Sequence, residues 1–368
     1  MRILYVTTIS LTMNSFFKPH IEMLVREGHR VSIACNCKDI DLDIFYYGLG
    51  CSVYQIDFSR SPLSPDNIKA YGQLKKLITN GNYDIVHCHT PNASVIARLV
   101  CRKFRKKSGL KVFYTAHGFH FYKGAPKLNW VVYYPIEKFC SRLTDKLITI
   151  NKEDYELAKN KFKAKEVLYV PGVGIDLSKF ENVQVDRSAK RREIGVPEDA
   201  FLLLSVGELS ERKNHKLVLQ ALAQIENANI HYMIVGKGAL QDELQRFAQE
   251  HQLAQRVHLL GYRKDIVELY KASDLCCFPS IHEGLPVALM EAMACGLSVA
   301  CSRIRGNTDL INEDGGIVFD PHCVDDCRQA IIRMLNSDRK RMGEVNQNRV
   351  QSFSLEKIVA TMKSVYES

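Results

Sequence analysis

One predicted helix start in this chain offers a row of backbone groups suited to an anion. In the segment 274–300, DLCCFPSIHEGLPVALMEAMACGLSVA, the pattern predicts a strand that ends at Phe278, a loop, and a helix from Pro286 to Ala294. Proline is tolerated at the first helical position, and a glycine follows the last. Because the first N–H groups of a helix have no partner within it, they attract anions. The amides from Leu285 to Ala288 therefore predict a corner that binds a diphosphate.

Two glutamates stand beside this corner. Glu283 precedes it, and Glu291 lies more than one turn into the predicted helix, on the face of Val287. A carboxylate in that position can accept hydrogen bonds from ribose hydroxyls. Carboxylate pairs with this spacing occur by chance in many proteins, so the spacing alone identifies no ligand. The alternative is that both carboxylates only decorate the start of a helix.

A second charged group follows a predicted strand in the segment LLLSVGELSERKNHKLVLQAL. Gly207 forms a turn after this strand, and Lys213 precedes a helix predicted from His215 to Ile225. Without further context, a lysine in this loop is explained as a solvated loop charge. Further along, Gly236 and Gly238 lack the third glycine of the dinucleotide-binding fingerprint, so an NAD site is not expected.

Short apolar runs alternate with longer amphipathic segments throughout the chain. This alternation is typical of βαβ units and a mainly parallel sheet. The break between two sets of predicted strands falls near Val170 to Phe180, where a proline, two glycines and a possible helix start precede a polar segment. The strands are predicted to begin at Ile3, Val31, Val53, Ile85, Val112, Leu147 and Val167, and at Leu202, Tyr232, Val257, Leu275, Val299 and Ile317.

The composition fits a two-domain protein of the cytosol. With 368 residues, 46% of them hydrophobic and 25% charged, the chain exceeds the size of most single cores. No apolar window approaches the roughly 18 residues of a membrane span, and the first residues lack the features of a secretory signal. The twelve cysteines have no zinc-site spacing, and the net charge of +9 is moderate. Neither a metal nor a nucleic-acid partner is expected.

The strand, the PS loop, the EGLP corner and the helix MEAMACG together resemble the retaining glycosyltransferases of family 4. These enzymes have the two-domain GT-B fold and carry an E-x7-E motif at this place. The resemblance covers essentially the whole chain and is strongest over 201–316. It implies an α/β protein with two Rossmann-like, doubly wound domains that face a central cleft. We expect an acceptor-binding domain at 1–171, a nucleotide-sugar-binding domain at 172–350, and a helix at 351–368 that packs back on the first domain.

The resemblance assigns roles to both glutamates. The first glutamate of the motif faces the donor sugar and the second binds the nucleotide ribose, and the matching residues are Glu283 and Glu291. The other implied donor contacts come from turns at which the backbone approaches the phosphates or pairs with the base. These are Gly207, Gly236, Gly261, Tyr262, Arg263, Gly284, Leu285, Pro286 and Val287.

The cations of the implied diphosphate site depart partly from the family pattern. Lys213 matches the family lysine that grips the diphosphate and counts among the expected catalytic residues. Many members have an arginine at the position where this chain has Glu208. Either Arg212 or Arg305 would then supply the second cation.

In the first half, the segment KVFYTAHGFHFY places His117 between a strand and a glycine. A lone histidine is often structural, but the family has a histidine at this strand end that contacts the donor sugar, so His117 is expected in the active site. The loop after the first strand, TTISLTMNSF, departs from the glycine-rich loop of many members. Asn14 and Ser15 are expected to replace its amides as an acceptor loop.

The segment CSRIRGNTDLI resembles the form found in a subgroup that acts on lipid-linked intermediates of capsule, exopolysaccharide or glycoprotein glycans. The implied function is the retaining, metal-independent transfer of a hexose or N-acetylhexosamine from a nucleotide sugar, UDP-linked, to a polyprenyl-diphosphate-linked sugar. A metal-binding DxD is spelled by Asp39, Asp41 and Asp43, but the cap of a helix start explains it better. The alternatives are a sugar-nucleotide epimerase of the same fold and a non-catalytic nucleotide-binding protein.

Two segments indicate a membrane surface as a partner. The stretch 119–139, FHFYKGAPKLNWVVYYPIEKF, combines aromatic rings with lysines, which suits a membrane interface. The basic run from Arg102 to Lys107 would add attraction to anionic headgroups, although it also fits a helix end. We therefore expect a cytoplasmic protein, peripheral on the cytosolic face of the membrane.

Overall fold

The apolar runs of the sequence form thirteen strands. The computed structural model describes residues 1–368. The first seven strands are β1 (Arg2–Ile9), β2 (Arg30–Asn36), β3 (Ser52–Gln55), β4 (Ile85–His89), β5 (Lys111–Ala116), β6 (Lys146–Thr149) and β7 (Glu166–Tyr169). The other six are β8 (Phe201–Val206), β9 (Ile230–Val235), β10 (Val257–Leu259), β11 (Leu275–Phe278), β12 (Ser298–Ser302) and β13 (Gly316–Phe319). Every predicted strand is present and begins within two residues of its predicted start.

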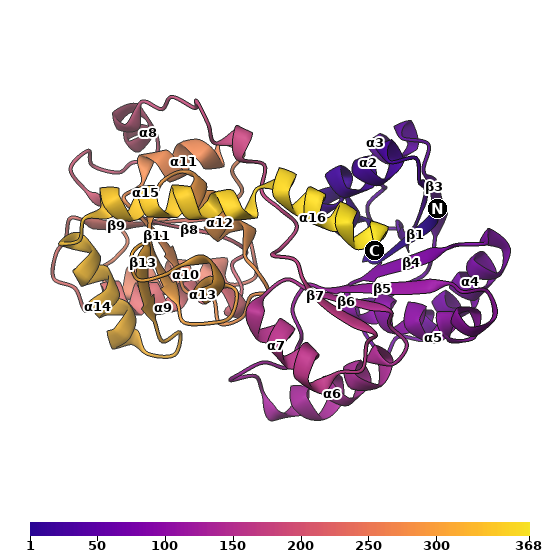
Figure 1. The fold of residues 1–368 in the computed structure, drawn as a ribbon. Helices are drawn as coiled ribbons and strands as arrows, with labels where there is room; N and C mark the ends of the chain where they lie inside the picture. The colour runs from indigo at the N-terminus through magenta and orange to yellow at the C-terminus, as the bar shows by residue number, and fades with distance from the viewer. The chain divides into compact units, whose positions relative to one another are not determined.

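The strands form two parallel sheets with the same winding. The first sheet has the order β3-β2-β1-β4-β5-β6-β7 and the second the order β10-β9-β8-β11-β12-β13 (Figure 1). In each sheet the order reverses at one pair of strands, β1 and β4 or β8 and β11. Ligands of such sheets bind outside the carboxyl ends of the strands at this switch point. The predicted class, two Rossmann-like doubly wound domains, is confirmed.

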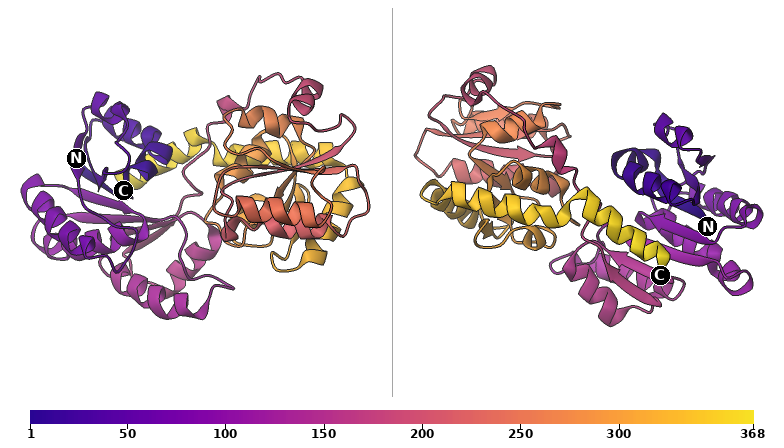
Figure 2. Two further views of the ribbon diagram at one scale, coloured as in Figure 1. Left: turned by 180° about the vertical axis from the view of Figure 1, so that it is seen from behind. Right: turned by 45° about the horizontal axis from the view of Figure 1, so that its top comes forward.

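Helices cover both faces of each sheet (Figure 2). With the first sheet lie α1 (Ser10–Phe16), α2 (Lys18–Arg26), α3 (Ile44–Gly48), α4 (Asp66–Gly81), α5 (Pro91–Lys107), α6 (Lys127–Ser141), α7 (Lys152–Lys161) and α16 (Leu355–Glu367). With the second lie α8 (Arg187–Glu193), α9 (His215–Leu222), α10 (Gln241–Glu250), α11 (Ile266–Ala272), α12 (Val287–Ala294), α13 (Asn307–Leu310), α14 (Val324–Leu335) and α15 (Arg339–Val350). Three short 3₁₀ turns are η1 (Leu177–Lys179), η2 (Glu211–Lys213) and η3 (Gln351–Phe353).

The chain divides into two compact units, and it passes from one unit to the other twice. Unit 1 comprises Met1–Gly174 and Leu355–Ser368, and unit 2 comprises Ile175–Ser354. Gly174 belongs to unit 1 because it packs on α16, where an added Cβ would lie 2.7 Å from the Cα of Leu355. Ile175 opens unit 2, since its N–H donates to the carbonyl of Phe353 at 3.0 Å. The divisions therefore fall after 174 and 354, where the sequence suggested 171 and 350.

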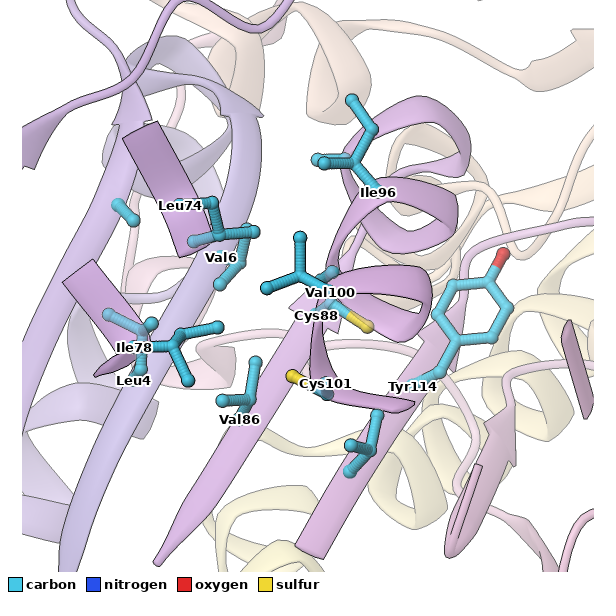
Figure 3. Close-up of a cluster of buried hydrophobic side chains, with 14 of the residues drawn as sticks. Leu4, Val6, Leu74, Ile78, Val86, Cys88, Ile96, Val100, Cys101 and Tyr114 are labelled. Atoms are coloured by element: carbon cyan, nitrogen blue, oxygen red, sulfur yellow. The ribbon is translucent and has the colours of Figure 1, made fainter. Parts of the chain in front are cut away.

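The core of unit 1 follows from the alternation of side chains along its strands. Leu4, Val6 and Val86 point to one face and pack under α4 and α5 (Figure 3). Ile3 and Tyr5, which alternate with them, point to the other face and pack with α1, α2, α3 and α16. Both faces are buried, as expected for a parallel sheet.

The last helix is an integral part of unit 1. Tyr366 of α16 bonds His87 of β4 through its hydroxyl, and the Nζ of Lys146 donates to the carbonyl of Val365 at 2.7 Å. Ile358 and Met362 contribute to the buried cluster beside α2. The terminal helix thus covers the face of the first sheet that α1, α2 and α3 leave open.

Candidate functional site

The switch point of the second sheet brings together two loops, one after β8 and one after β11. Gly207 follows β8, and an added Cβ there would lie 3.0 Å from the Cε of Lys213, so the glycine leaves room for the lysine side chain. At Gly236, which follows β9 with a φ of 151°, a Cβ would lie 1.9 Å from the carbonyl oxygen of Gly207. Only a glycine allows the two turns to approach this closely. The glycine turns that the sequence suggested thus shape the path of the lysine.

Lys213 and Arg212 both bind one carboxylate oxygen. The Nζ of Lys213 and the Nη1 of Arg212 each lie 2.7 Å from the Oε1 of Glu283. The Lys213 and Glu283 side chains are 12% and 11% exposed, and the Nζ also lies 4.7 Å from the ring centroid of Phe278. Partial burial strengthens these interactions relative to a solvent-exposed ion pair. Two cations against one carboxylate leave an excess positive charge at this point.

The start of α12 adds backbone donors to this charge. Pro286 is the N-cap residue, and no side chain caps the N–H groups of the first turn, which begins at Val287. The predicted helix included Pro286; the structure begins it one residue later because Pro286 has an extended ψ of 120°. The uncapped amides and the macrodipole favour an anion here.

A neighbouring turn holds the corner between Glu283 and Leu285 in place. Gly306 has a φ of 78°, and an added Cβ would lie 2.4 Å from the carbonyl oxygen of Gly284. The Nε of Arg305 donates to the carbonyl of Glu283 at 3.2 Å, and its Nη2 lies 2.7 Å from the Nε2 of His282. Arg305 therefore binds the backbone of the corner, whereas Arg212 binds both the carboxylate of Glu283 and the carbonyl of His282.

Glu291 lies on α12 in a partly apolar setting. Burial raises the pKa of its carboxyl above the usual value, and a hydrogen bond from Tyr270 works against this rise. The hydroxyl of Tyr270 lies 3.4 Å from the Oε2 of Glu291 and donates to the carbonyl of Ala288 at 2.8 Å. This arrangement holds a hydrogen-bond acceptor one helical turn beyond the uncapped amides.

The turn predicted to recognise the base follows β10. The N–H of Gly236 donates to the carbonyl of Gly261 at 2.9 Å, which links the two glycine turns. Tyr262 is 69% exposed. The guanidinium of Arg263 binds Asp265 at 2.8 Å and Glu193 at 2.5 Å, so this side chain stabilises the turn. A contact between Arg263 and a nucleotide base would therefore involve its backbone rather than its side chain.

In unit 1, His117 follows β5 within a group of histidines. Its Nε2 lies 3.2 Å from the Nδ1 of His89, and its ring packs against Phe17. Burial, reinforced by His20, lowers the pKa of His117 to about 4. The N–H of Phe119 donates to Asp154 at 3.0 Å and holds the following loop. His117 is therefore a neutral imidazole near pH 7.

Asn14 and Ser15 lie in helix α1, so the expectation of a loop at these residues is wrong. The side-chain amide of Asn14 donates to the carbonyl of Asp41 at 3.0 Å and accepts from the N–H of Asp43 at 2.9 Å. Ser15 bonds the carbonyl of Leu11 one turn earlier. Both side chains stabilise local structure. Asp43 caps α3 by accepting from the N–H of Phe45, which confirms the predicted capping role.

The basic run of α5 is not a uniform patch. Arg105 binds both carboxylate oxygens of Asp145, at 2.7 and 2.8 Å, and the carbonyl of Arg142. Its side chain is only 15% exposed and is held in this ion pair. The interpretation of the whole run as a lipid-binding patch is therefore wrong for Arg105. The exposed cations of this helix end include Lys106 and Lys107.

Helix α6 presents an apolar stripe to solvent. Six side chains spaced by three or four residues share this face. They are Leu128, Val131, Val132, Pro135, Ile136 and Phe139, of which Leu128 and Val131 are 70% and 71% exposed. No helix of the chain is long and apolar enough to span a membrane.

Two residues of the site, Asn214 and Tyr270, were not predicted from the sequence. Asn214 adopts a left-handed conformation with a φ of 55°, and its amide binds the carbonyls of Pro279 and Pro321 at 3.3 and 2.9 Å. It thereby joins the loop of Lys213 to the loop of Glu283. Asparagine is enriched in the left-handed conformation, but no local pattern specifies the two distant partners of Asn214. No local pattern specifies Tyr270, the partner of Glu291, either.

Comparison with known proteins extends across both units. The family model described as Glycosyl transferase 4-like matches residues 2–151, and the one described as Glycosyl transferases group 1 matches residues 186–349. EpsD of Bacillus subtilis, named as a glycosyltransferase, is 35% identical over 316 residues, which cover 85% of this chain and 81% of that protein. The fold is similar to sucrose-phosphate synthase from Thermosynechococcus elongatus, with a TM-score of 0.81, 20% identity, and coverage of 100% and 98%.

A second relative has a more specific name. It is the UDP-Gal:alpha-D-GlcNAc-diphosphoundecaprenol alpha-1,3-galactosyltransferase of Escherichia coli. The identity is 30% over 313 residues, which cover 82% of this chain and 79% of that enzyme. The two doubly wound parallel sheets define the GT-B fold class. Within that class, the chain belongs to the family 4-like glycosyltransferases.

Proposed function

We propose that this glycosyltransferase moves a hexose or N-acetylhexosamine from a UDP-sugar to a sugar carried on a polyprenyl diphosphate. Retention of the anomeric configuration and independence of a metal are part of the proposal. The observation that carries it is the pair of cations, Lys213 and Arg212, on the single carboxylate oxygen of Glu283 beside the uncapped start of α12. The Escherichia coli relative, whose name specifies both UDP-galactose and a diphosphoundecaprenol acceptor, supports the choice of substrates.

When the donor binds, its diphosphate replaces Glu283 as the ionic partner of Lys213 and Arg212. Glu283 is their counter-ion in the structure, and a diphosphate with more negative charge competes for Lys213 and Arg212 while the amides of α12 bind its oxygens. Glu283 is then released to face the donor sugar. Charge that develops on the departing diphosphate meets donors already in place, which is the largest catalytic contribution of many enzymes.

Bond making and breaking balance without a further reactant. The acceptor hydroxyl attacks the anomeric carbon while the bond from that carbon to the β-phosphate oxygen breaks. Both events occur on the same face of the sugar, so the configuration is retained. The departing phosphate oxygen takes the hydroxyl proton. The products are UDP and the extended lipid-linked glycan.

The other residues bind and position the donor. Glu291 accepts hydrogen bonds from the ribose, and its raised pKa reflects its partial desolvation. The backbone of the turn at Gly261 and Tyr262 pairs with the base. His117, neutral near pH 7, contacts the donor sugar. Arg212 is the second phosphate cation, because it binds the same carboxylate oxygen of Glu283 as Lys213.

Two cations and a helix start perform the task that a divalent metal performs in other transferases. We therefore propose that activity is retained in EDTA. A strict requirement for manganese would contradict this part of the proposal.

Unit 1 is proposed to bind the acceptor at the cytosolic face of an anionic membrane. The apolar stripe of α6 includes Leu128 and Val131 and is accompanied by Lys127 and Lys138 of the same helix. Apolar side chains with flanking lysines match a bilayer whose surface is negatively charged. The exposed Lys106 and Lys107 of α5 contribute further positive charge to this unit.

The function is tested by incubating the full chain with UDP-galactose, UDP-glucose and their N-acetylated counterparts, with and without N-acetylglucosaminyl-diphosphoundecaprenol. We expect UDP release only when the acceptor is present, and a lipid product one sugar heavier. Donor consumption without acceptor would indicate a different reaction. Absence of both would contradict the proposed substrates.

A further inference from the structure

Unit 1 contains a cavity at the carboxyl ends of β4 and β5. It measures about 200 Å³ and lies between α5, α6 and the loop 118–121. Its lining includes Pro91 and Asn92, which follow β4, and Gly118, which follows β5. The carboxyl ends of strands are where sheets of this class bind ligands.

Four polar side chains at the cavity wall, those of Asn67, Asn92, Tyr114 and Glu137, are already engaged within the protein. Glu137 binds Arg98 through both carboxylate oxygens, at 2.8 and 3.1 Å, and lies 3.4 Å from the hydroxyl of Tyr114. The side-chain amides of Asn67 and Asn92 donate to loop carbonyls. A sugar needs several convergent hydrogen-bonding partners, and these groups are committed elsewhere. The wall therefore suits a ligand with few polar atoms.

Apolar side chains provide most of the remaining surface. Val95, Ile96, Phe119, Phe121, Tyr133 and Ile136 line the cavity. A cavity of roughly 150 Å³ with comparable aliphatic and aromatic walls binds benzene in an engineered protein, so about 200 Å³ accommodates a short branched hydrocarbon segment. A complete disaccharide is too large for this space.

The cavity continues into the exposed stripe of α6. Ile136 lines the cavity and also belongs to the stripe, where it is 41% exposed. Glu137, the next residue, is buried in the ion pair with Arg98 of α5. That pair fixes α6 beside the cavity, since separating a buried pair leaves an uncompensated charge. A chain that leaves the cavity therefore passes directly onto an apolar surface.

We propose that this cavity binds the first isoprene units of the polyprenyl chain of the acceptor, and that the rest of the chain runs along the stripe of α6 into the bilayer. The inference rests on the proposed function for the identity of the acceptor. It assigns a selective lipid site to unit 1, distinct from the nonspecific contact of α6 with a membrane. The acceptor is thus recognised through its lipid as well as its sugar.

Binding can be tested without catalysis. Full-length protein on vesicles of phosphatidylethanolamine and phosphatidylglycerol is photolabelled with undecaprenyl phosphate that carries a diazirine near the phosphate, and the labelled peptides are mapped. We expect label in segments 91–96 and 133–137, and competition by unlabelled undecaprenyl phosphate but not by added phospholipid. Label elsewhere, or equal competition by phospholipid, would overturn the proposal.

A variant that fills the cavity provides the matched comparison. Val95→Trp places a large side chain in the cavity, whereas Ile68→Trp introduces the same side chain at an exposed position of α4 outside it. Val95→Trp should reduce labelling by on the order of tenfold, and Ile68→Trp should not. Ile136→Trp, at a partly exposed position, repeats the test should Val95→Trp unfold. Unchanged labelling in both folded cavity variants contradicts the assignment.

Kinetics separate this inference from the proposed function. Val95→Trp should lower kcat/KM about tenfold for the undecaprenyl acceptor and leave it unchanged for the same sugar diphosphate on a butyl chain. An equal loss with both acceptors would overturn the lipid site. Should wild-type protein transfer sugar to neither acceptor while the photoprobe still maps to the cavity, the proposed function fails and the lipid site stands.

Discussion

The Nζ of Lys213 lies 2.7 Å from the Oε1 of Glu283, although 70 residues separate them in the chain. The contact closes the switch point of the second sheet, because one residue follows β8 and the other follows β11. A carboxylate thus holds the lysine where a diphosphate is proposed to bind. Ligand binding has to exchange one anionic partner for another, with little movement of the cation.

Lys213→Ala should weaken the binding of UDP by about 10- to 100-fold, because a charge-assisted hydrogen bond to a phosphate is lost. Lys216→Ala is the control, since Lys216 pairs with Glu243 on a surface where both side chains are more than 40% exposed. Isothermal titration of UDP measures both. Equal affinities of the two variants would remove Lys213 from the diphosphate site.

Gly236→Ala should destabilise the protein by about 2–4 kcal/mol, because its Cβ would meet the carbonyl of Gly207 at 1.9 Å in a backbone conformation that L-residues avoid. Gly195→Ala also meets a positive φ, of 73°, but no atom within 4 Å, and should cost about 1 kcal/mol. Urea denaturation gives both free energies of unfolding. Similar values would show that the approach of the two turns is not tight.

Acidification should destabilise unit 1 through His117. Its folded pKa of about 4 lies below the usual value of 6.5, so the unfolded state binds the proton more readily between these values. The contribution is complete above pH 6.5 and is lost as the pH falls toward 4. From pH 7 to pH 5 the expected loss is on the order of 2 kcal/mol.

The variant His117→Asn removes this contribution and should flatten the dependence of unfolding free energy on pH. His251→Asn, at an exposed position, serves as the control. Urea denaturation at pH 7 and pH 5 checks the difference. The same slope in wild type and His117→Asn would contradict the burial of a neutral His117.

Val131→Asp should reduce co-sedimentation with phosphatidylglycerol vesicles by roughly tenfold, because it puts a charge into the apolar stripe of α6. Ile68→Asp, 78% exposed on α4, should bind as wild type does. Neutralising Lys106 and Lys107 should reduce binding mainly at low salt, whereas Arg105 is left intact for its pair with Asp145. No binding of wild type at low salt would reject the membrane surface as a partner.

The fold and the site differ in how far the sequence could predict them. Strand starts are encoded locally, since apolar runs such as LLLSV have few other stable arrangements. The turn at Gly284 could be predicted for the same reason, because strand, loop and helix follow one another directly in the sequence. Lys213 and Glu283 came from a motif resemblance, and the contact that joins them depends on the strand order of the sheet.

Side-chain partners from distant segments could not be predicted. Asparagine is common in loops, but Asn14 lies in α1, where its side-chain amide bonds the backbone of Asp41 and Asp43. Arg105 belongs to a run of five cations, and only the position of Asp145 distinguishes it from the others. Tyr270 meets Glu291 because α11 packs near α12, which no local pattern specifies.

The most direct test of the central claim follows labelled sugar from UDP-galactose into N-acetylglucosaminyl-diphosphoundecaprenol, with wild type, Glu283→Gln and the exposed control Glu243→Gln. We predict an α-linked lipid product from wild type and from the control, and turnover at least about tenfold lower for Glu283→Gln. Label that leaves the donor only as free sugar, or full turnover by Glu283→Gln, would contradict the assignment of this site to glycosyl transfer.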